Sequence, residues 1–184
     1  MVIFFGLCWG FCASVAASPK SILRMGMIEE PTGLNPVFRG STAEAMIIAL
    51  SFRSLAHFDA ESELVPHLAK VLPIFENNNL VFEIRETAKW DDGAPVTCED
   101  FHTGVSADRK FRPSKNPKVD KVTWDPKSPR QCVVVFNQPK PIYTLYLPPP
   151  LPTHLEKKII AQSENEIEYL KNSWYTRSEE RRVG

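Results

Sequence analysis

The stretch from Leu80 to Phe101 constrains the fold of this chain more than any other part of the sequence. Apolar and polar residues alternate over residues 80–85, which predicts a β-strand with one buried face. The pair Asp92-Gly93 predicts a turn, because glycine tolerates the positive φ angle that such turns need. Thr97, with Asp100 three residues later, predicts the N-cap and first turn of a helix. We therefore expect one unit of strand, turn and helix.

The same stretch carries a resemblance to a known protein family. The residues concerned are Phe82, Ile84, Arg85, Lys89, Trp90, Asp92, Gly93, Pro95, Thr97, Glu99, Asp100 and Phe101. In order and spacing they resemble the signature region of the bacterial extracellular solute-binding proteins of family 5. These proteins are the oligopeptide-, dipeptide- and nickel-binding components of ABC importers. Cys98 departs from the family, which usually has a small residue such as alanine at that position.

The resemblance covers roughly residues 23–176 and implies an α/β fold. Family members are two-lobed proteins with the type II periplasmic-binding-protein fold, and their lobes close around a ligand by a hinge motion. Family members are much longer than the 184 residues of this chain. We therefore expect an N-terminal portion, consisting of part of the first lobe plus an inserted subdomain. The second lobe, the hinge and an acidic residue that pairs with a peptide N-terminus are expected beyond Gly184.

The sequence divides into three expected segments. Residues 1–17 are apolar, end in small residues and are shorter than the ~20 residues of a membrane-spanning helix. They predict a signal peptide, with a buried N-terminal segment as the alternative. Residues 18–176 are expected to be the N-terminal part of a solute-binding domain, truncated at its C-terminal end. Residues 177–184 resemble the translation of a sequencing adapter and are expected to be a non-native tail.

The candidate ligand contacts are Gly40, Ser41 and Thr42. In the family, a first strand, here expected over residues 22–28, is followed by a Glu-Pro loop that leads to the ligand cleft. The resemblance thus implies that the backbone and hydroxyl groups of these three residues face a ligand. Ser41 with Glu44 also matches a capping box, so Ser41 could serve only to cap the next helix; the two roles are compatible. The core side of that helix is expected to consist of Ala43, Met46, Ile47, Leu50 and Ser54.

Further elements follow from local patterns. We expect strands near residues 55–58 and 64–69, and a hairpin over residues 74–82 with asparagines in its turn. Two more strands are expected at 119–124 and 132–136, the second covered on both faces. Thr153 with Glu156 predicts a helix cap, and residues 164–172 have a helical composition. The proline-rich segment 147–152 is expected to be a rigid loop.

No catalytic residue, metal site or cofactor is predicted. The sequence lacks the Gly-x-Ser-x-Gly, His-Glu-x-x-His, P-loop and Gly-x-Gly-x-x-Gly motifs. The sequence has four histidines, His57, His67, His102 and His154. Their spacing does not match that of metal ligands. Asp91 and Asp92 resemble a carboxylate pair for acid–base chemistry, but neighbouring turn residues usually point apart.

Cys98 and Cys132 are the only cysteines after the expected signal peptide. In an exported protein they could form a disulfide, which would stabilise the fold by about 3–4 kcal/mol. Two buried free thiols are equally compatible with the sequence. In a third interpretation, Cys98 lies at a helix N-terminus and is reactive because its pKa is lowered.

Composition and the resemblance together define the expected function. The formal net charge is zero, so nothing predicts nucleic-acid or membrane-surface binding. The resemblance implies a periplasmic, monomeric substrate-binding component of an ABC importer, which captures peptides or related small solutes for permease subunits. Peptide, nickel, sugar, opine and haem ligands all remain open. The alternatives are an exported interaction or adhesion module that uses the proline-rich segment and, less expected, a hydrolase fragment.

Overall fold

The computed structural model describes residues 25–31, 33–38, 40–113, 119–137 and 147–173. The signal peptide expected at 1–17 and the tail expected at 177–184 lie outside these residues. The elements, in chain order, are α1 (Thr42–Ser51), β1 (Ala56–Phe58), β2 (Leu64–Pro66), β3 (Ile74–Glu76), β4 (Asn79–Glu83), α2 (Cys98–Phe111), β5 (Val119–Trp124), β6 (Gln131–Phe136), α3 (Thr153–Gln162) and α4 (Glu166–Asn172). Among the described helices, none is both long and apolar enough to cross a membrane.

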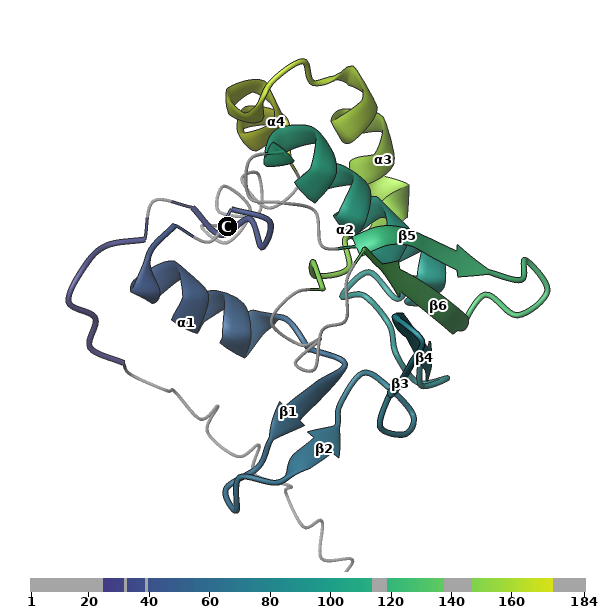
Figure 1. The fold of residues 1–184 in the computed structure, drawn as a ribbon. Coiled ribbons are helices and arrows are strands. Elements are labelled where there is room, and N and C mark those ends of the chain that lie inside the picture. Colours follow the sequence, from purple (N-terminus) through teal and green to yellow (C-terminus); the bar gives the residue numbers. More distant parts are fainter. Residues whose placement is uncertain (1–24, 32, 39, 114–118, 138–146, 174–184) are drawn as a thin grey trace, which may run out of the picture.

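The strands form two antiparallel sheets. β1 and β2 make a separate hairpin, and the larger sheet has the order β3-β4-β6-β5 (Figure 1). The turn between β3 and β4 contains Asn77 and Asn78, whose φ angles are 48° and 65°. Asparagine tolerates this left-handed conformation better than most residues, and the predicted hairpin is therefore confirmed.

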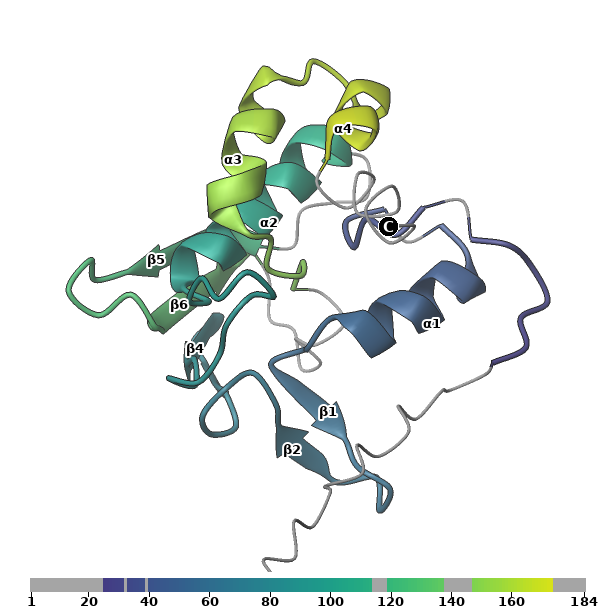
Figure 2. The same cartoon turned by 180° about the vertical axis from the view of Figure 1, so that it is seen from behind.

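Helix α2 covers one face of the larger sheet and forms the first core with it. Phe101 of α2 meets Phe82 of β4 edge-on, with ring centroids 5.1 Å apart. The buried members of this core include Leu80, Phe82, Ile84, Val96, Phe101, Val105, Val122, Val134 and Phe136. Helix α3 packs on α2, as the view from behind shows (Figure 2). The subdomain therefore has three layers: sheet, α2 and α3.

A second core joins the loop before α1 to the helices at the other end of the described chain. Its buried members are Val37, Ala107, Phe111, Leu151, Ile160 and Tyr169. The Phe111 and Tyr169 rings are stacked with their centroids 4.5 Å apart. Phe38 and Phe52, which flank α1, pack against this core. Segments far apart in sequence thus fix the approach to α1.

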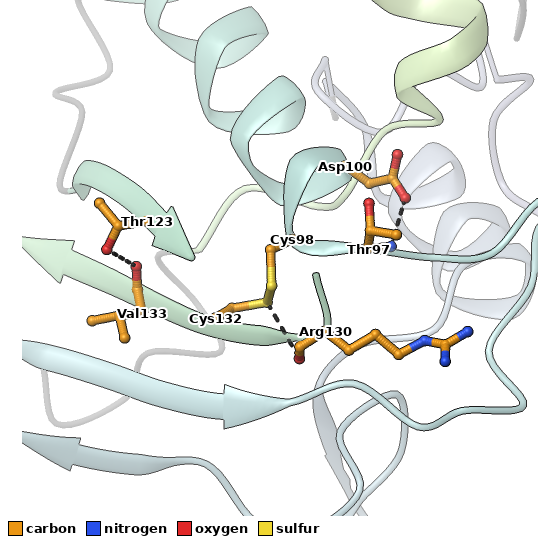
Figure 3. Close-up of a disulfide and its surroundings, with 7 residues drawn as sticks. All are labelled: Thr97, Cys98, Asp100, Thr123, Arg130, Cys132 and Val133. Carbon is orange, nitrogen blue, oxygen red and sulfur yellow. Dashed lines mark hydrogen bonds between the residues drawn. A yellow bond between two sulfur atoms is a disulfide. The ribbon is translucent and has the colours of Figure 1, made fainter. Parts of the chain in front are cut away.

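A disulfide joins Cys98, the first residue of α2, to Cys132 of β6 (Figure 3). The two Cα atoms are 5.5 Å apart, and the residues are separated by 34 positions in the sequence. Both cysteines are fully buried. Of the three interpretations that the sequence left open, the structure contains the disulfide, which ties the helix to the sheet that it covers.

Two expectations about the N-terminal part were wrong. Ala43 of α1 is buried, but so are Glu44 and Ile48, whereas Met46 and Leu50 are exposed. The helix is apolar on nearly all sides, so the spacing of apolar residues could not identify its buried face. The first strand, expected over residues 22–28, is absent from its described part, 25–28. No described strand pairs with it, and a strand needs such a partner to bury its backbone groups.

The predicted cap of α3 was also wrong. Pro152, not Thr153, is the N-cap residue, and no side chain caps this end of the helix. Glu156 is instead fully buried, and its Oε1 accepts a hydrogen bond of 3.0 Å from the hydroxyl of Ser173. A contact with α4 therefore determines the position of Glu156, and local sequence spacing does not reveal such a contact.

Candidate functional site

The carboxylate of Asp100 is the centre of the stretch that defines the expected family. It is buried, and its Oδ2 accepts hydrogen bonds from the Thr97 backbone N–H at 2.9 Å and from Trp90 Nε1 at 3.1 Å. Its Oδ1 accepts from the Thr153 backbone N–H at 2.9 Å. One side chain thus joins the turn, the N-cap of α2 (Figure 3) and the start of α3. The indole N–H and the carboxylate explain why tryptophan and aspartate occur at this spacing.

Of the pair Asp91-Asp92, Asp92 is part of the same framework. Asp92 Oδ2 lies 2.6 Å from His154 Nε2 on α3, and Asp92 Oδ1 accepts from the Ala94 N–H at 3.0 Å. The hydrogen bond from His154 is the main reason that the pKa of Asp92 lies below its usual value. Gly93 has a φ angle of +88°, which confirms the expected turn. Asp92 therefore has structural partners that account for its position in the turn.

The proline-rich segment is packed against α2. Pro150, Leu151 and Pro152 are buried. A Cβ atom added to Gly104 of α2 would lie only 2.0 Å from the Pro149 carbonyl oxygen, so the close approach requires glycine. The rigid-loop prediction is confirmed for these residues. Because they are buried, these three residues do not form an exposed polyproline ligand for another protein.

Gly40, Ser41 and Thr42 lie together at the N-terminus of α1, where two carboxylates occupy the backbone N–H groups. Glu44 Oε2 accepts from the N–H of Gly40 at 2.7 Å and of Ser41 at 3.1 Å. Glu29 Oε1 accepts from the N–H of Thr42 at 3.1 Å, and the Ser41 hydroxyl accepts from the Glu44 N–H at 3.2 Å. The expected capping box is confirmed.

The comparisons with known proteins support a single family. No family model matches the chain. Over 88 residues it is 34% identical to the periplasmic murein peptide-binding protein MppA of Escherichia coli, a stretch that covers 48% of this chain and 16% of that protein. The oligopeptide-binding protein AppA from Bacillus subtilis, solved with a nonapeptide, matches with a TM-score of 0.59 and 20% identity, over 84% of this chain and 29% of that one. Over these stretches the chain is similar to solute-binding proteins of the kind that the sequence resembles.

A second solved member shows that the fold extends across ligand classes. NikZ from Campylobacter jejuni, solved with Ni(L-His), matches with a TM-score of 0.58 and 23% identity, over 70% of this chain and 27% of that one. The predicted family and fold class are confirmed for the matched region. The chain corresponds to less than a third of the length of these solute-binding proteins.

Within this family framework, buried polar contacts hold the loop that leads to α1. Asn35 Nδ2 donates to the Ser173 hydroxyl at 3.0 Å, and Asn35 Oδ1 accepts from the Val37 N–H at 3.0 Å. Arg112, the C-cap residue of α2, donates to the Val37 carbonyl. Burial, followed by the nearby Glu156 carboxylate, raises the pKa of Tyr169 well above its usual range, which keeps its hydroxyl protonated. The loop is therefore anchored to the helices on the far side of the second core.

The three predicted ligand contacts differ in solvent exposure and in the hydrogen bonds of their side chains. Gly40 and Thr42 are exposed and Ser41 is half-buried. The Thr42 hydroxyl has no hydrogen bond to any other residue in the described part of the chain, whereas the Ser41 hydroxyl caps the helix. The backbone N–H groups are occupied by Glu29 and Glu44. Of the three residues, Thr42 therefore has the side-chain group best placed to meet a ligand.

The sequence interpretation missed one pair of histidines. His57 of β1 and His67, just after β2, lie with their ring centroids 4.6 Å apart. The antiparallel pairing of β1 and β2 brings them together. The sequence analysis predicted strands near residues 55–58 and 64–69 but did not pair them. Within the described residues, no group of three or more His, Cys, Asp or Glu side chains could hold a metal ion.

Proposed function

We propose that this chain is part of the substrate-binding component of an ABC importer. It captures a peptide or a related small solute outside the inner membrane and delivers the solute to permease subunits. The observation that supports this most directly is the 34% identity to a protein whose name describes periplasmic binding of murein peptides. Neither alternative has such support, because Asp92 has structural partners and residues 150–152 of the proline-rich segment are buried.

The proposal includes the division of the chain and its location. Residues 1–17 are a signal peptide that directs the protein to the periplasm, 18–176 belong to the solute-binding domain, and 177–184 are a non-native tail. The protein acts as a monomer. Met46 and Leu50 of α1 are exposed, which fits a helix that further parts of a two-lobed protein would cover. The chain supplies part of a ligand cleft, and we expect residues 18–176 alone to show no saturable peptide binding by calorimetry.

We also propose that Gly40, Ser41 and Thr42 form one wall of the ligand site. The N-terminus of α1 is held rigidly by Glu29 and Glu44, and the preceding loop is anchored through Asn35. A rigid backbone reduces the entropy that binding must remove. The ligand contact of this wall is then the Thr42 hydroxyl, while Ser41 keeps the helix end in place.

Uptake by whole cells tests the transport function. We expect deletion of the gene to lower uptake of a labelled oligopeptide mixture, and expression of the gene from a plasmid to restore it. Parallel assays with labelled nickel, sugars and haem identify the solute class. Unchanged uptake of every solute in a strain that normally expresses the gene would overturn the transport proposal.

A single substitution in the gene product tests the ligand wall. Thr42→Val removes the hydroxyl and preserves the side-chain shape, so we expect the transported solute to bind about 3–10-fold more weakly. Thr87→Val is the matched control, since Thr87 is also exposed and lies in a turn. Equal affinities for the two variants would remove Thr42 from the site and leave the transport proposal intact.

A further inference from the structure

The C-terminal end of α1 borders a cavity that the proposed ligand wall does not include. The cavity has a volume of about 370 Å³, within the range of about 300–1,000 Å³ typical of small-molecule sites. It lies between α1, the β1–β2 hairpin, α2 and the proline-rich segment. α1 has 10 residues, and a helix rises 1.5 Å per residue, so its two ends are about 15 Å apart. We call this cavity the Arg–His pocket.

The floor of the Arg–His pocket is apolar. It is lined by Ile48 of α1, by Leu55 just before β1, and by Phe101 of α2. All three side chains are buried. Pro149 and Pro150 complete this side of the cavity. Their surfaces offer no hydrogen-bonding side chains, so the part of an occupant that reaches the floor must be apolar.

The rim of the pocket carries three nitrogen-containing side chains. Arg53, His57 and His67 all line the cavity. Arg53 Nη1 lies 2.9 Å from His67 Nε2. Because a guanidinium can only donate, His67 Nε2 must accept, and the proton of the neutral imidazole is then on Nδ1. The rim therefore contains the remaining guanidinium N–H donors of Arg53, next to two imidazole rings.

The rim has positive charge without a carboxylate to balance it. Within the described residues, no aspartate or glutamate forms an ion pair with Arg53 or with the nearby Arg85. Burial, followed by the charges of Arg53, His57 and Arg85, lowers the pKa of His67. An arginine fork fits the two oxygens of a carboxylate, so the missing partner has a defined chemistry.

From this arrangement we infer that the Arg–His pocket binds an amphipathic carboxylate, with the acid group on Arg53 and the apolar body over Ile48, Leu55 and Phe101. An apolar ligand without a charge would leave the arginine unpaired. A small polar anion would leave the apolar floor uncovered. A molecule with both parts contacts the charged rim and the apolar floor at the same time.

Calorimetry with the full chain and decanoate, below its micelle-forming concentration, tests the inference. We expect saturable binding of one decanoate, and at least tenfold weaker binding of decanol, which has the same chain without the charge. Arg53→Gln should weaken decanoate binding about tenfold, whereas Lys127→Gln, at an exposed lysine in the turn between β5 and β6, should leave it unchanged. Equal binding of decanoate and decanol, or no binding of decanoate, would overturn the inference.

A second variant separates loss of the site from loss of the fold. Ala49 lines the pocket from an exposed position on α1, so Ala49→Phe fills the cavity without changing a buried residue. We expect this variant to keep the helical circular dichroism signal and to lose decanoate binding. Undiminished binding by a folded Ala49→Phe variant would show that decanoate occupies another surface. Thr42→Val should bind decanoate normally, which keeps this result independent of the proposed solute site.

Discussion

The Asp100 region and the N-terminus of α1 contain similar hydrogen bonds but differ in the role that we give them. In both, carboxylates accept hydrogen bonds from backbone N–H groups at the start of a helix. Asp100 is buried and all its bonds join parts of the fold, namely Thr97, Trp90 and Thr153. Around α1 the carboxylates leave Gly40 and the Thr42 hydroxyl exposed. The residues that carry the family resemblance therefore hold the fold together. The proposed ligand wall, by contrast, has no distinctive sequence motif.

Removal of the disulfide should give the largest loss of stability. The bridge closes a loop of 34 residues, and its loss in a Cys98→Ala/Cys132→Ala double variant should cost about 3–4 kcal/mol through the entropy of the unfolded chain. Urea unfolding followed by tryptophan fluorescence measures the change. A loss below about 1 kcal/mol would show that the packing of α2 on the sheet does not depend on the bridge.

Asp100→Asn should produce the next largest effect. The amide replaces an acceptor with a donor that faces N–H groups, so buried hydrogen bonds to a charged group are lost at a cost of about 2–3 kcal/mol. Asp91→Asn is the matched control, since Asp91 is exposed and belongs to the same stretch; it should change the free energy of unfolding by less than about 0.5 kcal/mol. Equal unfolding free energies for the two variants would contradict the framework role of Asp100.

Gly104→Ala tests the contact between α2 and the proline-rich segment. The added methyl group would meet the Pro149 carbonyl oxygen, and relief of that overlap should cost about 1–3 kcal/mol even though alanine favours helix. Ser106→Ala, two positions later in α2, serves as the control in the same thermal unfolding experiment. An unchanged or raised midpoint for Gly104→Ala would show that the segment does not lie on the helix.

The contact between Asp92 and His154 should give the smallest effect. The pKa of Asp92 is lower in the folded chain than its usual value of 3.8. The contact therefore contributes stability above that value, and the contribution is lost as the pH falls through the folded-state pKa. Both side chains are solvent-exposed, so the loss should be small. Asp92→Asn should unfold with a weaker pH dependence than the native chain between about pH 5 and pH 2; identical pH profiles would contradict this.

Local rules predicted the elements whose cause is local. Asn77 and Asn78 adopt left-handed angles in the β3–β4 turn, Gly93 does so in its own turn, and Thr97 begins α2. These outcomes depend on backbone preferences and caps within a few residues. The predicted contacts Gly40, Ser41 and Thr42 also lie together for this reason, because they are consecutive at one helix end.

Distant contacts determined what the sequence could not predict. The surroundings of α1, and not its own apolar spacing, leave Ile48 buried and Leu50 exposed. Glu156 is positioned by Ser173, and Gly104 by Pro149. The histidines His57 and His67 meet only through strand pairing. None of these contacts has a periodic or motif-like signal in the sequence.

The Trp90–Asp100 contact stabilises the fold, whereas we propose that Thr42 meets the solute. Solute affinity of the gene product carrying Trp90→Phe tests it most directly, since this change removes the indole N–H that binds Asp100 and keeps an aromatic ring. We predict that unfolding becomes easier by about 1–2 kcal/mol, while the folded protein binds its solute within about twofold of the native affinity. A tenfold loss of affinity with unchanged stability would contradict the account and place Trp90 in the ligand site.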